Sequence, residues 1–210
     1  VVVFDFRNSG LNPVHDGTHG YQRFLADMTD VYNSIDLEFG KKRQIGAFHS
    51  MSARTNLKLA MYREARLDGL IAFDPPMVPP SNHPLYETMQ AEERVLCRWS
   101  AGRSELFDDP SELAAAYASS RMLSRWVDGA YDLMARSVLR KNNDTENWQL
   151  VCSPSREAEV YRQNAAMNIW PQASEISIPI LLIGSDPDSD IPSAPGLACQ
   201  ALHKECDWPY

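Results

Sequence analysis

The chain has 210 residues, of which 44% are hydrophobic and 23% are charged, and these proportions are typical of a globular domain. The formal net charge of −8 argues against nucleic acid and against an anionic membrane surface as partners. The sequence contains no run of about 18 apolar residues, the length needed to span a bilayer. The N-terminus lacks the charged and apolar regions of a signal peptide, so the default expectation is a cytoplasmic protein.

The N-terminal part of the chain predicts a strand followed by a helix. Val1–Phe6 is a short apolar run that we expect to be a buried strand. A polar loop over 8–18 follows, rich in Gly, Pro, Asn and Asp. Thr18 is a candidate N-cap for a helix whose apolar residues recur at helical spacing from 21 to 35, and Gly40 ends that segment.

The segment over 43–64 is the most informative. A short apolar run, Ile45–Phe48, leads to His49 and Ser50, and a helical pattern follows without Pro or Gly before Gly69. This pattern predicts a strand, a sharp turn at Ser50 and a helix. Such a turn directs the first N–H groups of the helix toward the atom that the hydroxyl attacks. The alternative interpretation is that Ser50 only caps the helix.

Two further apolar runs predict a parallel sheet. Residues 70–73 form a continuous apolar run, as in a strand covered on both faces, and residues 178–184 contain another. Between them, from about 77 to 173, the pattern becomes mostly helical, with Asp109 and Pro110 as one helix start. Strands that alternate with helices favour an α/β fold with a parallel sheet.

The four cysteines, Cys97, Cys152, Cys199 and Cys206, lie far apart, without a C-x-x-C pair or a histidine at ligand spacing. We therefore expect free thiols in a reducing compartment rather than disulfides. The sequence predicts neither a metal ion nor a cofactor.

The triplet His49-Ser50-Met51 resembles the nucleophile elbow of the α/β-hydrolase superfamily, whose usual pattern is G-H-S-M-G. Phe48 and Ser52 replace the flanking small residues, and Gly46 and Ala47 are expected to relieve the crowding that the Phe48 ring causes. The resemblance implies a partial α/β-hydrolase fold, with a parallel central sheet, flanking helices and an inserted helical cap.

Other segments occur in the order that the superfamily has. They are the turn at Arg7-Asn8-Ser9-Gly10, the exit at Asp74-Pro75-Pro76 and the exit at Gly184-Ser185-Asp186. The resemblance implies a hydrolase core over 1–76 and 174–210 and a helical cap over 77–173. It also implies a fragment of a larger protein, truncated at both ends of the sheet.

The resemblance implies roles for individual residues. Ser50 is the expected nucleophile, and the Met51 backbone N–H is one expected donor to the oxyanion. The acid that orients the catalytic histidine is expected after the late strand, where Asp186 is preferred and Asp188 is close behind. Asp74 is a third candidate. A solvated acidic turn is the structural alternative for the residues near 186.

The histidine base is expected beyond Tyr210, because His203 lies in a segment that has the pattern of a surface helix. His15 and His19 are weaker candidates for lining the site. The second oxyanion donor is expected before Val1. Loss of one such donor costs roughly 3 to 4 kcal/mol of transition-state stabilisation, so we expect the 210 residues alone to be inactive or nearly so.

The implied activity is that of a capped serine hydrolase. Its substrate is expected to be an ester or thioester of an apolar or amphipathic small molecule, cleaved through an acyl-enzyme at Ser50. One alternative is a carbon–carbon bond hydrolase on the same fold, and another is a hydrolase-like protein that binds a ligand without catalysis. A small-molecule substrate is the only partner predicted, and the sequence gives no oligomeric state.

Overall fold

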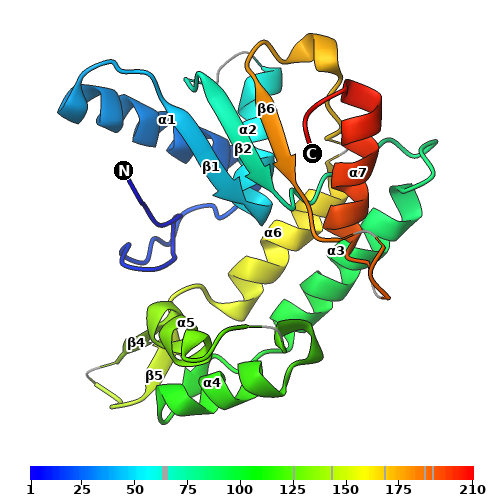
Figure 1. Ribbon diagram of the computed structural model, residues 1–210. Coiled ribbons are helices and arrows are strands. Elements are labelled where there is room, and N and C mark those ends of the chain that lie inside the picture. The colour runs from blue at the N-terminus through cyan, green and yellow to red at the C-terminus, as the bar shows by residue number, and fades with distance from the viewer. Residues whose placement is uncertain (63–65, 125, 143, 168, 187, 191) are drawn as a thin grey trace. The chain divides into compact units, whose positions relative to one another are not determined.

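The computed structural model describes residues 1–210 except 63–65, 125, 143, 168, 187 and 191 (Figure 1). The described residues form two compact units. The small unit contains Val1–His19 and Cys97–Glu159, and the sheet unit contains Gly20–Leu96 and Val160–Tyr210. The domain bounds predicted from the sequence, with a cap over 77–173, stay a prediction.

A three-stranded parallel sheet forms the centre of the sheet unit, in the order β1-β2-β6. The strands are β1 (Ile45–His49), β2 (Gly69–Phe73) and β6 (Ile180–Ile183). The last residues of the strands pair in register, His49 with Phe73 and Phe73 with Ile183. The predicted parallel sheet is therefore confirmed, and the carboxyl ends of its strands lie at one edge.

Helices pack on this sheet (Figure 1). Helix α2 (Ser50–Met61) contacts β1 and β2, α1 (Tyr21–Phe39) contacts α2, and α7 (Ala194–Cys206) contacts β6. The division between the units falls within α3 (Tyr86–Ala101) and α6 (Pro154–Ala166), and a short 3-10 turn, η2, covers Ala173–Glu175. The apolar core of the sheet unit includes Tyr21, Phe24, Met28, Leu57, Leu70 and Leu182.

Helix α1 begins later than predicted. Its N-cap is Gly20 rather than Thr18, and glycine has no side chain that could bond to the helix. The Tyr21 N–H donates instead to Gln163 Oε1 at 2.8 Å. The prediction was wrong because this acceptor comes from a residue distant in sequence. The predicted end is confirmed, since Gly40 follows the helix with a φ of 74°.

The small unit contains an antiparallel sheet in the order β3-β5-β4, with two helices. Its elements are β3 (Leu106–Phe107), α4 (Pro110–Ser119), the 3-10 turn η1 (Arg121–Leu123), α5 (Ala130–Val138), β4 (Leu139–Lys141) and β5 (Trp148–Leu150). Its core consists of Phe107, Leu113, Ala114, Tyr117, Ala135, Leu139 and Leu150. The mostly helical prediction missed β3 and β4, because strands this short show no alternating pattern. The start of α4 is confirmed, since the Asp109 carboxylate accepts the Ser111 N–H at 2.8 Å.

The N-terminal segment corrects another prediction. Residues 1–6 form no strand, and Val3 is 88% exposed. Strands need a partner edge as well as apolar residues, and in this segment the ordered contacts are those of a turn. The Asp5 carboxylate accepts the Leu11 N–H at 2.8 Å. Gly10 is needed there because its φ is 53° and a Cβ atom would lie 2.0 Å from the Asp5 carboxyl carbon.

Candidate active site

Ser50 occupies a sharp turn between strand and helix. It is the first residue of α2 and follows the last residue of β1 directly. Its φ is 53°, in the left-handed region, which costs a residue with a side chain of order 1–3 kcal/mol. The N-cap of α2 is His49, which is extended and makes no side-chain cap bond. Ser50 therefore does not serve as the helix cap, and a strained backbone of this kind is typical of a functional position.

Gly46 explains how Phe48 fits into this turn. The two residues lie on the same face of β1, because side chains alternate along a strand. A Cβ atom on Gly46 would lie 2.5 Å from Phe48 Cε2 and 2.7 Å from Leu67 Cδ1. The missing side chain thus provides the space that the Phe48 ring occupies. The space at Gly46 agrees with the expectation for that residue, and the contribution expected of Ala47 stays a prediction.

The N-terminus of α2 surrounds the serine with backbone donors. The helix has 12 residues, so its peptide dipoles place partial positive charge at Ser50 and Met51. The Met51 N–H belongs to the first turn, where N–H groups have no acceptor within the helix. Ser52 Oγ donates to the His49 carbonyl at 2.6 Å, whereas the Ser50 hydroxyl makes no hydrogen bond to the described part of the chain. This arrangement can hold negative charge that develops beside Ser50.

The three parallel strands bring candidate site residues to one edge of the sheet. Ser50, Asp74 and Gly184 each follow a strand directly, and the preceding residues are paired in register. Neighbouring strands lie about 4.8 Å apart. The backbone of Asp74 therefore lies one strand spacing from that of Ser50, and the chain leading to Asp186 leaves from two strand spacings away.

Asp74 links two of these strand ends. Its φ is 41°, and its N–H donates to the Ile183 carbonyl at 2.9 Å. Its Oδ1 accepts the Ser185 N–H at 2.8 Å. One oxygen of the half-buried carboxylate therefore fixes the exit of β6 to the exit of β2, which is a structural role.

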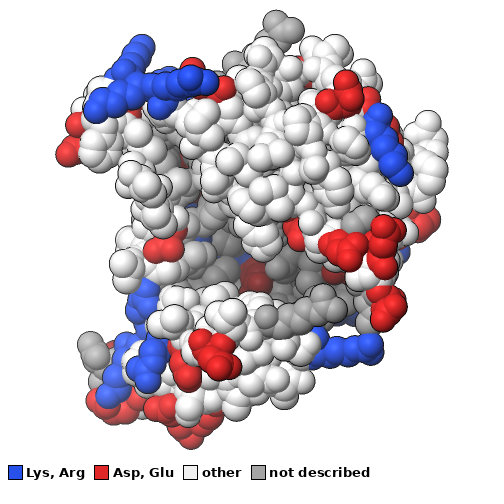
Figure 2. Space-filling view, in the orientation of Figure 1, with Lys and Arg blue, Asp and Glu red and all other residues white. Residues whose placement is uncertain are grey.

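The candidate acids after β6 lie in an exposed turn. Asp186, Asp188 and Asp190 are all exposed, and Figure 2 shows acidic side chains on the side of the sheet unit where this turn lies. Asp186 Oδ1 accepts the Asp188 N–H at 2.9 Å, as in an Asx turn. Pro187, which stands between Asp186 and Asp188, lies outside the described residues. The role of Asp186 stays a prediction.

The histidines of the sheet unit are engaged elsewhere or exposed. His203 Nδ1 lies 2.6 Å from the Trp208 carbonyl, so this nitrogen must donate its proton. His83 Nε2 lies 2.8 Å from Glu205 Oε1, and its Nδ1 accepts the Leu85 N–H. His49 is exposed at the end of β1. Within the described residues, no histidine forms a hydrogen bond with Ser50, and the base predicted beyond Tyr210 stays a prediction.

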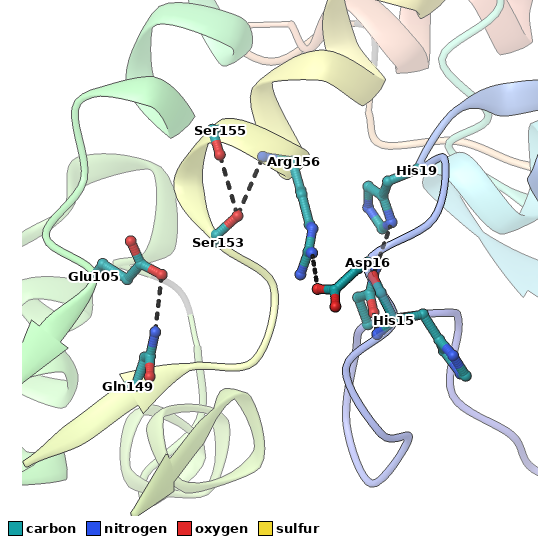
Figure 3. Close-up of polar contacts among 9 residues, drawn as sticks. His15, Asp16, His19, Glu105, Gln149, Ser153, Ser155 and Arg156 are labelled. Carbon is teal, nitrogen blue, oxygen red and sulfur yellow. Dashed lines mark hydrogen bonds and ion pairs between the residues drawn. The ribbon is translucent and has the colours of Figure 1, made fainter. Parts of the chain in front are cut away.

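The small unit contains a second group of polar side chains (Figure 3). His19 Nδ1 lies 3.2 Å from Asn8 Nδ2, and His19 Nε2 lies 3.7 Å from Cys152 Sγ. Arg156 pairs with Asp16 at 3.4 Å nearby. The order of Cys, His and Asn is that of a thiol nucleophile, its base and the residue that orients the base. The sequence contained no signal for this group, because its members are far apart along the chain.

The proton positions argue against nucleophilic chemistry at Cys152. Asn8 Oδ1 accepts the His15 N–H at 2.6 Å, so the Asn8 amide group faces His19 as a donor. His19 Nδ1 is then the acceptor, and the protonated Nε2 faces the thiol and cannot take its proton. Burial raises the pKa of the Cys152 thiol to about 11, so the thiol is neutral. The His15 ring points away from the group (Figure 3). We therefore interpret the group of Asn8, His19 and Cys152 as structural.

Other site types find no support in the part of the chain that the structure describes. There, no group of three or more His, Cys, Asp and Glu side chains could hold a metal ion. The four cysteines are free thiols, with Cys199 and Cys206 buried and Cys97 and Cys152 half-buried. No described helix combines the length and the apolar character needed to cross a membrane.

Comparison with known proteins gives matches to solved structures. No protein-family model matches the chain, and none of the curated proteins does. The chain is similar to E-2-(acetamidomethylene)succinate hydrolase, with a TM-score of 0.71 and 19% identity over 98% of this chain and 69% of that one. A thioesterase domain from the curacin biosynthetic pathway gives a TM-score of 0.63 and 15% identity, with 98% and 69% coverage. An esterase from Thermogutta terrifontis gives a TM-score of 0.59 and 16% identity over 98% of this chain and 67% of that one.

Proposed function

Because the chain has the α/β-hydrolase fold over the part that it spans, we propose that it belongs to a serine hydrolase in which Ser50 is the nucleophile. The observation that best supports this proposal is the φ of 53° at Ser50, between β1 and the N-terminus of α2. A serine in an ordinary cap or loop does not need this conformation. The elbow of the superfamily does, because it must raise the hydroxyl above the sheet edge.

In the proposed mechanism, Ser50 Oγ attacks the carbonyl carbon of the substrate, and the Met51 N–H donates to the oxyanion that forms. The positive end of the α2 dipole stabilises the same charge. Collapse of this intermediate expels the alcohol or thiol and leaves an acyl-enzyme, which water hydrolyses. Asp186 orients the histidine that takes and returns the proton, and that histidine is the one predicted beyond Tyr210.

We propose an ester or thioester of an apolar or amphipathic small molecule as the substrate. The similarity to a thioesterase domain and to an esterase supports this class. The elbow geometry is equally compatible with a carbon–carbon bond hydrolase, but no contact among the described residues favours that reaction. A ligand-binding protein without catalysis is the remaining alternative, and it differs in the reactivity of Ser50.

Labelling with a fluorophosphonate probe tests the proposal. The complete gene product is treated with the probe, and the modified peptide is identified by mass spectrometry. We expect an adduct on Ser50 that is lost in Ser50→Ala. Ser52→Ala is the matched control, because it removes a neighbouring hydroxyl that already donates to the His49 carbonyl, and it should leave labelling intact. A folded protein with no adduct at Ser50 would refute the nucleophile and favour the binding protein.

A further inference from the structure

A buried arginine lies one helical turn after Ser50. The Arg54 side chain on α2 is 0% exposed. Its Nη1 donates to the Pro76 carbonyl at 3.1 Å and lies 3.4 Å from Glu93 Oε1 on α3. The Tyr21 ring faces the guanidinium with its centroid 5.1 Å away. A buried ion pair seldom stabilises a protein more than apolar side chains of the same size do, so stability does not explain this residue.

The contacts of Arg54 favour the backbone over the ion pair. The distance to Pro76 is that of an ordinary hydrogen bond, whereas the distance to Glu93 is long for a charge-assisted one. Arg54 Nε, Arg54 Nη2 and Glu93 Oε2 have no hydrogen-bond partner among the described residues. Asn164 on α6 lies near enough to Glu93 to lower the pKa of its carboxyl, although its amide atoms do not meet the geometry of a hydrogen bond. The guanidinium is thus placed for its bond to the Pro76 carbonyl rather than for the best pairing of charge.

The Pro76 carbonyl belongs to the chain that leaves β2. It lies two residues after Asp74, which is bonded through its N–H and its carboxylate to the exit of β6. The next residue, Met77, is fully buried, and its N–H donates to the Pro75 carbonyl at 2.8 Å. Arg54 therefore connects the helix of the nucleophile to the segment that fixes the neighbouring strand ends.

From this geometry we infer that Arg54 is a positioning residue, which holds the Ser50 elbow against the chain that leaves β2 and thereby against the turn of the candidate acid. The inference rests on the proposed role of Ser50. The strained turn at Ser50 persists only where surrounding contacts fix it, and the bond to Pro76 supplies one such contact. A displacement of about 1 Å at a nucleophile can lower a rate about 100-fold.

The test compares Arg54→Met, Arg54→Lys and Tyr32→Phe in the complete gene product. Arg54→Met removes the donor, and Arg54→Lys keeps a cation with N–H donors at the same position of α2. Tyr32→Phe removes another buried bond to α2, the one between Tyr32 and Asn56, and controls for loss of stability alone. Each variant is measured for Tm, for the rate of Ser50 labelling by the fluorophosphonate, and for hydrogen exchange of the Asp74 and Met77 amides.

We expect Arg54→Met to slow labelling at least about tenfold and to speed exchange at both amides, while Tyr32→Phe changes neither. Arg54→Lys should recover part of each effect, and it decides the question if Arg54→Met does not fold. Labelling and exchange that match wild type in a folded Arg54 variant, or that change equally in Tyr32→Phe, would overturn the inference. If wild-type Ser50 is never labelled, the proposed function fails, and amide exchange still decides whether Arg54 positions the segment.

Discussion

Replacing Glu93 by glutamine should make the stability of the protein less dependent on pH. The pKa of Glu93 is raised from 4.5 to about 7, mainly because burial disfavours its charge. The Arg54 charge and Asn164 oppose this shift, and the charge of Glu92 adds to it. Burial likewise lowers the pKa of Arg54. Both shifts have one cause, which is that the interior disfavours each charge and the pair does not fully compensate. Gln reproduces the neutral form of Glu93 at every pH.

The sign and the size of the effect follow from linkage. A carboxyl whose pKa is higher in the folded than in the unfolded protein stabilises the fold at a pH below 4.5, and this stability is lost as the pH rises through about 7. The difference between these pKa values corresponds to about 3 kcal/mol. Glu93→Gln should therefore be about 1 kcal/mol more stable than wild type at pH 5 and about 3 kcal/mol more stable at pH 8, because only the wild type must bury the carboxylate.

Urea unfolding at a series of pH values from 5 to 8 measures this difference, since each curve gives a free energy of unfolding. Glu87→Gln is the control, because it makes the same change of net charge at an exposed position of α3. A free-energy difference between Glu93→Gln and wild type that stays constant over this range would refute the reasoning. So would a variant that becomes less stable than wild type at pH 8, because that result means a favourable ion pair.

Three further predictions concern the elbow and its neighbours. Ser50→Gly should be about 1 kcal/mol more stable than Ser50→Ala and should therefore unfold at a higher Tm, because glycine adopts a φ of 53° without strain; equal Tm values would contradict this. Gly46→Ala should lower the free energy of unfolding measured in urea by about 1–3 kcal/mol, because its Cβ would meet the Phe48 ring at 2.5 Å. Adding Phe48→Ala should relieve that contact. An unchanged free energy of unfolding in Gly46→Ala would show that the ring has free space. Asp186→Ala should lower kcat/KM about 100-fold or more with little change in Tm. Asp74→Ala should instead lower the stability by about 1 kcal/mol, because the Ser185 N–H loses its acceptor. The reverse pattern would make Asp74 the acid.

The sequence by itself determined the features that depend on neighbouring residues. The apolar runs predicted β2 and β6, and the Asp109-Pro110 pair predicted the start of α4. The run that ends at Phe48 and the helical pattern after it predicted the turn at Ser50. In each case the spacing of apolar side chains, or a cap within two residues, acts over one strand or one helical turn. Such local preferences survive in the folded protein when the tertiary contacts agree with them.

Only the tertiary structure decided the features that need a partner far along the chain. Val1–Phe6 has the composition of a strand but lacks a strand partner in the described sheets, whereas the short β3 and β4 form because β5 lies between them. The burial of Arg54 against the Pro76 carbonyl had no signal in the sequence, because a charged residue in a helix is usually exposed. Hydrogen bonds and ion pairs of this kind depend on how distant segments meet, and the spacing of residues along one segment does not contain that information.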